Sequence, residues 1–248
     1  LPFDLTTLQR ECNKYFGYSA KQTLDYAQSL YEKKLITYPR TDSRCLTEDM
    51  IISTVNNILG KNDFDTERIK VVFNSKKVTD HHAIIPTVSS LSEDISKLPE
   101  SEAKVYRLIF NKFHASVGYP LVENTTKIVA EFDGFQFTST GKVIKDEGFT
   151  KYLKEYKFNK NEDLELPDVS IGDVIIIENK EIKEKYTKPP KHFTEDTLLK
   201  AMELAGNDAL EKGVEVEREG LGTPATRAGI IENLIYKEFI ERDKKLSL

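Results

Sequence analysis

Cysteine is scarce in this chain of 248 residues, and its two thiols, Cys12 and Cys45, are too few for the disulfide framework of a small secreted protein. They do not have the Cys-x-x-Cys spacing, so we expect no zinc site. Long apolar runs are also lacking, since none approaches the roughly 20 residues that cross a bilayer. The opening residues 1–4 carry neither the basic nor the apolar segment of a secretion signal. These absences predict reduced thiols, no membrane partner and a cytoplasmic location.

An initiator methionine is missing too, and the chain opens directly into a structured pattern, so we interpret it as a piece excised from a longer protein. Its length allows one large domain or two to three small ones, and we expect a monomer. The net charge of −5 argues against a nucleic-acid partner, because domains that bind nucleic acids are usually basic. Local patches decide phosphate contact, however. Residues 180–192 hold five lysines against two glutamates, which fits either a solvated linker or a basic patch.

Local patterns at the start of the chain predict two helices. Thr6 or Thr7 could cap the first, which would end at Gly17. Ser19 and Gln22 have the spacing of a capping box, which places the start of the second helix directly after that glycine.

The remainder of residues 1–120 is also expected to be mainly helical. We predict a helix over 47–59 and another after Pro99, with short strands at 35–37 and 69–73. Two helices, a tight turn and a short strand are typical of a helix-turn-helix or winged-helix unit.

Residues 121–188 change to a β pattern. The segments 126–132 and 135–140 flank an Asp-Gly pair, which supplies the left-handed turn residues of a tight β-hairpin. A run of Val and Ile over 172–178 predicts another strand.

Residues 189–248 return to a helical pattern. Thr194 is expected to cap one helix, and Thr223 another that has Pro224 at its first position. The predicted buried face of the second helix comprises Ile230, Ile231, Leu234 and Ile235.

The most informative stretch is 35–44, Leu-Ile-Thr-Tyr-Pro-Arg-Thr-Asp-Ser-Arg. Pro39 disfavours a helical conformation at Tyr38, so this tyrosine should be extended or in a turn. Its phenol oxygen can act as a nucleophile, and the guanidinium of Arg40 can fork onto the oxygens of a phosphate. Asp42 and Arg44 are expected to brace the loop, Asp42 by hydrogen bonding within the turn. Any single one of the 11 tyrosines is more often a packing residue, so the case rests on the whole string.

A second string, Asp-His-His-Ala-Ile-Ile-Pro-Thr, covers residues 80–87. On an extended segment His81 and His82 point to opposite faces and make a poor metal chelate. An imidazole carries charge near neutral pH, so either ring could bind a phosphate or shuttle a proton.

A third string, Glu-Gly-Leu-Gly-Thr-Pro-Ala-Thr-Arg, covers residues 219–227. It is a glycine-bearing loop that leads into a capped helix start, which is either a seat for a phosphate or a turn needed only for packing.

The acidic cluster at 63–67, Asp-Phe-Asp-Thr-Glu, imitates a magnesium site. It lacks the apolar strand that should precede such a site, so we interpret it as a solvated loop.

In this order the three strings resemble the type IA DNA topoisomerases, and the Tyr-Pro-Arg form is similar to the topoisomerase III branch. The segment 188–194 resembles the family's entry into its last domain, so the resemblance covers nearly the whole chain. It implies the multidomain α+β fold of the central region of these enzymes. The parts would be a helical, winged-helix or CAP-like tyrosine domain (1–120), a β-rich arch or gate segment (121–188) and part of a second helical DNA-binding domain (189–248).

The resemblance also implies roles for individual residues. Tyr38 would be the nucleophile, Arg40 would stabilise charge on the phosphate, and His81 would support the scissile phosphate. The residues expected to bind DNA are Arg44, His82, Thr223, Thr226 and Arg227.

The implied reaction is ATP-independent breakage and rejoining of single-stranded DNA through a 5′-phosphotyrosine link, with strand passage that relaxes or decatenates DNA. The family's Mg²⁺ site lies in a Toprim domain, which matches nothing in this sequence. We therefore expect no metal site in this chain, a need for the missing Toprim domain as a partner, and no cleavage by the chain alone. The alternative is a non-catalytic module that binds single-stranded DNA or another protein.

Overall fold

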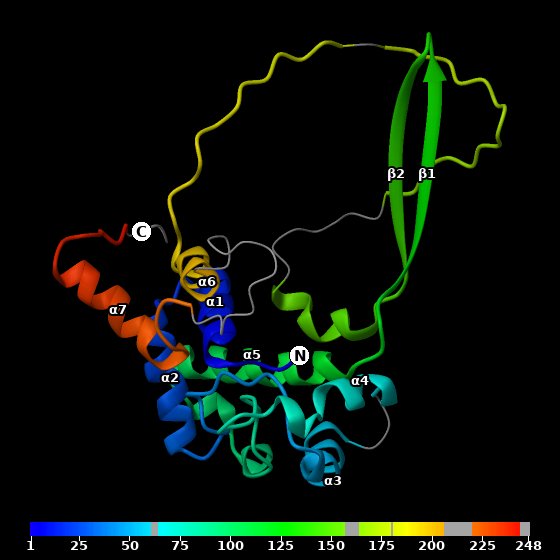
Figure 1. Ribbon diagram of the computed structural model, residues 1–248. Helices are drawn as coiled ribbons and strands as arrows, with labels where there is room; N and C mark the ends of the chain where they lie inside the picture. Colours follow the sequence, from blue (N-terminus) through cyan, green and yellow to red (C-terminus); the bar gives the residue numbers. More distant parts are fainter. Residues whose placement is uncertain (61–63, 157–163, 180, 206–219, 244–248) are drawn as a thin grey trace. The chain divides into compact units, whose positions relative to one another are not determined.

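The structure of the protein is a computed structural model (Figure 1), and it is described for residues 1–60, 64–156, 164–179, 181–205 and 220–243. Its contacts gather residues 1–119 and 192–248 into one compact unit and residues 120–191 into a second. The division of the chain into three domains stays a prediction.

The larger unit is helical. Its helices are α1 (Leu5–Phe16), α2 (Ala20–Glu32), α3 (Ile51–Thr54), α4 (Thr66–Val72), α5 (Glu100–Val117), α6 (Glu195–Leu204) and α7 (Pro224–Tyr236). Short 3-10 helices are η1 (Glu48–Met50), η3 (Ser75–Lys77), η4 (Ser89–Ser92) and η5 (Ile95–Lys97), and η2 (Val55–Leu59) is a short π-helix. The predicted helices over 47–59 and after Pro99 are confirmed, the first as the succession η1, α3 and η2.

The first two helices begin and end through local chemistry. The carboxylate of Asp4 accepts a hydrogen bond of 2.6 Å from the backbone N–H of Thr7, so Asp4 is the N-cap of α1. The prediction of a cap at Thr6 or Thr7 was wrong by two to three residues, because a carboxylate caps as well as a hydroxyl. Gly17 ends α1 with a φ of 71°, and the capping box of Ser19 that starts α2 is confirmed.

One predicted strand of this unit is a helix. Residues 69–73 lie in and just after α4, which Asp65 starts by accepting a hydrogen bond of 2.9 Å from the backbone N–H of Glu67. A short apolar run does not by itself distinguish a strand from a buried helix, and here the helix cap decides. The expected solvated loop at 63–67 therefore supplies this cap and the first turn of α4, while residue 63 lies outside the described residues.

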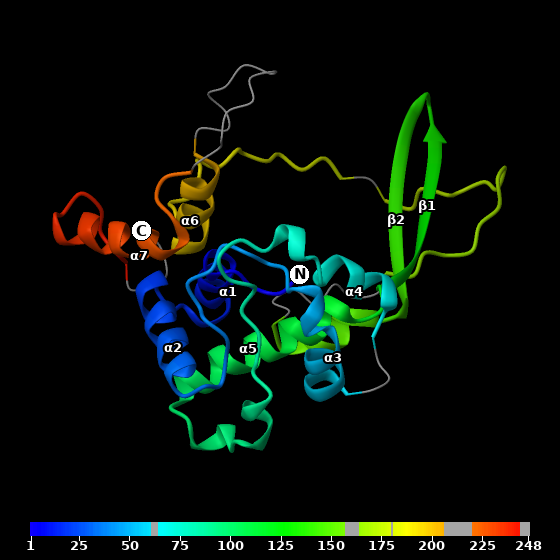
Figure 2. The ribbon, with the colours of Figure 1, turned by 60° about the horizontal axis from the view of Figure 1, so that its bottom comes forward.

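Two apolar clusters hold the larger unit together. The first joins α3, η2, α4 and α5, and its buried members are Leu46, Val55, Ile58, Val72, Phe73, Ala83, Ile85, Phe113 and Val117. The second joins α6 and α7 to the start of α2, and its buried members are Ala20, Leu199, Met202, Ala228 and Ile231. Figure 1 and Figure 2 both show α6 and α7 packed against α1 and α2.

The buried face of α7 differs from the predicted one. Ile231 is fully buried, but Ile230 is 36% exposed and Leu234 and Ile235 are only half-buried. The side chain of Arg227 takes the place of an apolar residue on the buried face, where it contacts α1.

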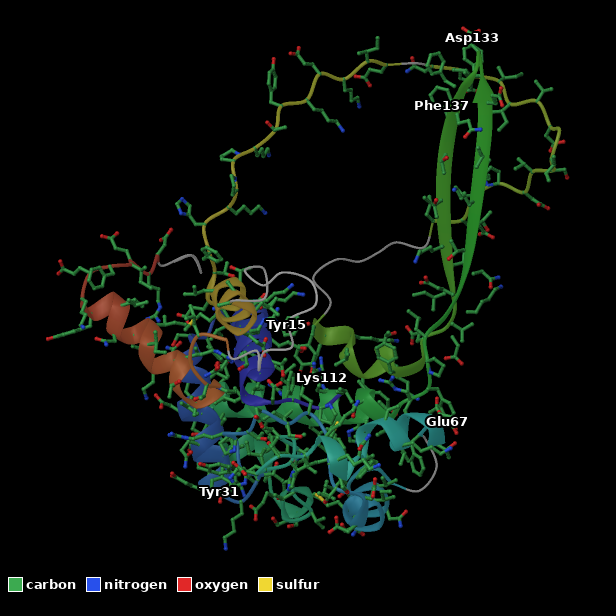
Figure 3. All side chains as sticks on the ribbon, viewed as in Figure 1. Tyr15, Tyr31, Glu67, Lys112, Asp133 and Phe137 are labelled. Carbon is green, nitrogen blue, oxygen red and sulfur yellow. The ribbon has the colours of Figure 1, made fainter. Side chains whose placement is uncertain are left out.

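The smaller unit is a long β-hairpin followed by η6 (Gly148–Tyr156). Strands β1 (Val122–Phe132) and β2 (Phe135–Asp146) are antiparallel, with Phe132 opposite Phe135. Asp133 lies at the tip (Figure 3). The φ angles of Asp133 and Gly134 are 52° and 78°, as the predicted Asp-Gly turn requires.

The predicted strand at 172–178 is absent: this segment belongs to no strand in the described part of the unit. Val174 and Ile176 are 91% and 83% exposed. Val and Ile favour a pleated surface only where a neighbouring strand is there to pair with, and the run alone does not provide one.

Candidate active site

The tyrosine string and the histidine string lie side by side although more than 40 residues separate them in the sequence. The backbone N–H of Thr37 donates to the carbonyl of Ile85 at 2.9 Å, and that of Thr87 donates to the carbonyl of Leu35 at 3.0 Å. Between them Ile36 and Pro86 form an antiparallel bridge. The main chain that precedes Tyr38 is therefore fixed by the segment that follows the histidines.

Two threonine hydroxyls reinforce this pairing. The hydroxyl of Thr37 donates to the carbonyl of Ala83 and accepts from the N–H of Ile85, both at 3.0 Å. The hydroxyl of Thr41, which is 3% exposed, donates to the carbonyl of His81 at 2.8 Å. Bonds on both sides of Tyr38 thus hold it opposite His81.

The ring of Tyr38 lies between two other rings. Its centroid is 4.5 Å from that of His81, with the ring planes tilted by 55°, and 5.3 Å from that of Tyr31, with an edge-to-face angle of 74°. Tyr38 is half-buried and His81 is exposed. The phenol is therefore positioned by packing yet lies at the surface, where a large substrate could reach it.

Arg40 is exposed, and its guanidinium has no carboxylate partner among the described residues. Its neighbour Asp42 accepts a hydrogen bond of 2.6 Å from the hydroxyl of Thr79, which braces the loop from outside it. A cation two residues from the tyrosine is thus left available for an anionic ligand.

Arg44 and His82 are half-buried and already partnered. The Nε of Arg44 donates to the carbonyl of Pro2 at 3.2 Å, and the Nδ1 of His82 lies 2.9 Å from the carbonyl oxygen of Ala83. These bonds leave the other nitrogens of both side chains for further contacts.

The third string forms the start of α7, apart from residue 219, which lies outside the described residues. The N–H of Thr223 donates to the hydroxyl of Thr226 at 2.9 Å, so both threonines cap the helix. Arg227 is 5% exposed; its Nε donates to the carbonyl of Leu221 at 3.2 Å and its Nη1 to the hydroxyl of Thr6 at 2.9 Å. The structure thus joins the first two strings to each other, whereas the third contacts α1.

The described residues contain no group of three or more His, Cys, Asp and Glu side chains able to hold a metal. In the acidic cluster Asp65 caps α4, and Glu67 forms an ion pair of 2.7 Å with Lys70. These donors do not fit a magnesium site. The same described residues include no helix long and apolar enough to cross a membrane.

Tyr31 is the residue at this site that the sequence pattern did not single out. It follows the buried Leu30 in α2, yet it is 39% exposed and its ring packs edge-to-face on that of Tyr38. The signal that could have found it is its position at the end of a helix that turns back within seven residues to the tyrosine string.

A tyrosine ring in contact with a histidine ring, with an exposed arginine two residues along the chain, has the groups for nucleophilic attack on a phosphodiester. The comparisons make the class specific. The family described as DNA topoisomerase matches residues 1–248, so the chain belongs to that family, and within it to the topoisomerase III-like type IA enzymes.

Topoisomerase 3 of Bacillus licheniformis is 38% identical over 264 residues, which cover 98% of this chain and 36% of that protein. Topoisomerase 3 of Vibrio cholerae is 36% identical over 262 residues, which cover 99% of this chain and 40% of that protein. The structure of full-length topoisomerase I from Thermotoga maritima is similar to this one, with a TM-score of 0.69 and 25% sequence identity. The match covers 99% of this chain and 39% of the Thermotoga maritima chain. The chain thus spans about two fifths of the length of these relatives, and its mixed α+β fold is that of the central region of type IA enzymes.

Proposed function

We propose that this chain is the part of a type IA DNA topoisomerase that carries the nucleophile, Tyr38. The complete enzyme would break and rejoin single-stranded DNA through a 5′-phosphotyrosine link and pass another strand through the gap, without ATP. The observation that carries the proposal is the ring of Tyr38 held against His81, two residues before the exposed Arg40, which has no carboxylate partner among the described residues. The family and the partial coverage of its members support it.

In the proposed reaction the phenol oxygen of Tyr38 attacks the phosphorus and the 3′-oxygen of the neighbouring nucleotide leaves. The phenol gives up its proton and the leaving oxygen takes one, so the step balances. A free tyrosine has a pKa of about 10, and on the order of one in a thousand is ionised at pH 7. The attack therefore needs a proton acceptor or nearby positive charge, for which His81 and Arg40 are placed.

Magnesium would be held outside this chain, by the acidic residues of a Toprim domain, since no donor set in the described residues fits it. The other proposed partner is single-stranded DNA, and we propose a cytoplasmic monomer.

We propose that DNA runs past Arg44 and His82 beside the tyrosine and reaches the start of α7 at Thr223 and Thr226. Arg227 would then support that helix start from within, because both of its bonds tie α7 to its own loop and to α1. The prediction that Arg227 lies near bound DNA stays a prediction.

The test combines this chain with a separately made Toprim segment, magnesium and a 3′-labelled single-stranded oligonucleotide, and quenches the reaction in detergent. We expect a covalent adduct from the combined pieces, none from the chain alone and none with Tyr38→Phe. Tyr26→Phe, which changes a tyrosine of α2 that packs on Tyr18, is the matched control and should form the adduct. An adduct that persists in Tyr38→Phe would contradict the proposal.

The alternative is a non-catalytic module that binds DNA or protein. Binding of the chain to single-stranded oligonucleotide that weakens with added salt would support DNA as its ligand, because phosphate contacts release counterions. Binding that is independent of salt would indicate a protein partner instead.

A further inference from the structure

We infer that Tyr31 is a positioning residue for the nucleophile: the edge-to-face contact of its ring holds the ring of Tyr38 against His81. The inference rests on the proposed role of Tyr38. The two contacts, with centroids 5.3 Å and 4.5 Å from that of Tyr38, come from different elements, Tyr31 from α2 and His81 from the histidine string. Edge-to-face packing is a favoured arrangement of aromatic rings and restricts both partners.

The backbone of Tyr31 is anchored without help from Tyr38. Tyr31 lies in the last turn of α2 (Figure 3), next to the fully buried Leu30. Glu102 of α5 accepts a hydrogen bond of 2.9 Å from the hydroxyl of Ser29 and forms an ion pair with Lys33. These contacts on either side of Tyr31 fix the rotation of the helix end, and with it the direction in which Tyr31 points.

The turn between the two tyrosines is fixed as well. Lys34 has a φ of 61°, and its N–H donates to the carbonyl of Tyr31 at 2.8 Å. Its carbonyl accepts hydrogen bonds from the hydroxyls of Thr87 and Ser89 at 2.6 and 3.1 Å. Tyr38 itself is held by the bonds of Thr37 and Thr41. The two rings therefore meet because two independently anchored backbones bring them together.

A nucleophile reacts fastest when it spends its time in the attacking orientation. Removal of the Tyr31 ring would leave one side of Tyr38 open and allow its side chain to turn away from His81. The cleavage step would slow, whereas affinity for DNA would change little. Since the contact is between rings, phenylalanine at position 31 should preserve it. A residue that only packed at the surface would affect stability without any of these differences.

The first test needs no catalysis. Tyrosine ring carbons are labelled with ¹³C in the whole chain, and the Tyr38 resonance is assigned from its loss in Tyr38→Phe. We expect Tyr31→Ala and Tyr31→Leu, the second of which retains apolar bulk, to shift that resonance. Tyr31→Phe and the control Tyr26→Leu should leave it nearly unchanged. A Tyr38 resonance that does not move in Tyr31→Leu would overturn the inference.

The second test is single-turnover cleavage at saturating oligonucleotide in the combined chain and Toprim segment. We expect Tyr31→Leu to lower the rate about tenfold with unchanged DNA affinity, and Tyr31→Phe to restore it, since small misplacements of reacting groups cost one to two orders of magnitude. Equal rates in Tyr31→Leu and the wild type, or an equal loss in Tyr31→Phe, would overturn the inference. Absence of an adduct in the wild type would instead refute the proposed function, and the resonance shift would still decide the ring contact.

Discussion

At the scale of single residues, the sequence placed Tyr38, Arg40 and His81 together by resemblance, and the structure puts the Tyr38 and His81 rings in contact. The sequence pattern did not single out Tyr31: its position seven residues before Tyr38 is only a hint, because the contact depends on how the chain turns after α2. The sequence also could not indicate how Arg227 is used. The start of a capped helix fits both phosphate binding and packing, and the hydrogen bond from Arg227 to Thr6 depends on a residue more than 200 positions away in the sequence.

Arg227 is the residue for which stability and DNA binding can be separated. Arg227→Ala leaves the buried hydroxyl of Thr6 and the carbonyl of Leu221 without this donor. Hydrogen bonds from a charged group contribute about 1.5–3 kcal/mol each, so we expect a loss of at least that size in the free energy of unfolding measured with urea.

Thr226→Ser, which keeps the capping hydroxyl, is the control, and its free energy of unfolding should stay near that of the wild type. Arg227→Ala with unchanged stability but weakened binding to single-stranded DNA would mean that its guanidinium serves the ligand.

Asp4 couples the start of α1 to pH. Burial raises the pKa of its carboxyl above the ordinary value, although hydrogen bonds from Thr7 oppose the shift. Because the pKa of Asp4 is higher in the folded than in the unfolded state, protonation of this carboxyl favours folding. The contribution of protonated Asp4 to the free energy of unfolding is fully present below the unfolded pKa and is lost as the pH rises through the folded pKa.

Asp4→Asn keeps a capping oxygen without the charge, so we expect it to abolish that dependence and to be at least as stable as the wild type at neutral pH. Asp4→Ala should lose about 0.5–2 kcal/mol because the cap is gone. Urea unfolding at acidic and neutral pH measures both. Asp4→Asn less stable than Asp4→Ala at neutral pH would contradict the capping role.

At the scale of elements, the sequence predicted what local chemistry decides. Gly17, the capping boxes that begin at Ser19 and Thr194, and the Asp-Gly turn of the hairpin were found because each depends on residues within a few positions. The two wrong strands, at 69–73 and 172–178, were runs rich in Val and Ile. Whether such a run forms a strand depends on whether another strand, remote in the sequence, lies beside it. The local pattern does not contain that information.

The first residues of α6 are attached to α1 and α2 mainly by hydrogen bonds and ion pairs. Glu195 is 3% exposed and accepts from the backbone N–H of Ala20, the first residue of α2, at 2.6 Å and from the Nε of Arg242 at 2.8 Å. Asp196 forms an ion pair of 2.7 Å with Arg10 of α1.

Glu195→Ala would leave the buried N–H of Ala20 without an acceptor and remove one of the two carboxylates that bind Arg242, which would keep Glu232. We therefore expect a loss of about 1.5–3 kcal/mol in the free energy of unfolding. Lys200→Ala, at an exposed position of the same helix, should stay within about 0.5 kcal/mol of the wild type. Chemical denaturation of both variants provides the measurement. Equal stabilities would show that the contacts of Glu195 do not help to hold α6.

At the scale of the whole molecule, family membership is shown for the full length of the chain, yet the chain spans only about two fifths of its relatives. The proposed nucleophile and its neighbours are present, while the described residues hold no cluster that fits a metal. In the proposal the active site is therefore completed by a second part of the enzyme, and Tyr38 is half of it.

The most direct measurement of the central claim is peptide mapping of the covalent adduct by mass spectrometry, after cleavage of end-labelled oligonucleotide by the combined chain and Toprim segment. The predicted result is a nucleotide mass on the peptide that contains Tyr38, with the 3′ label retained and the 5′ label released. A nucleotide on any other residue, or retention of the 5′ label, would contradict the assignment of Tyr38 as the nucleophile that forms a 5′-phosphotyrosine.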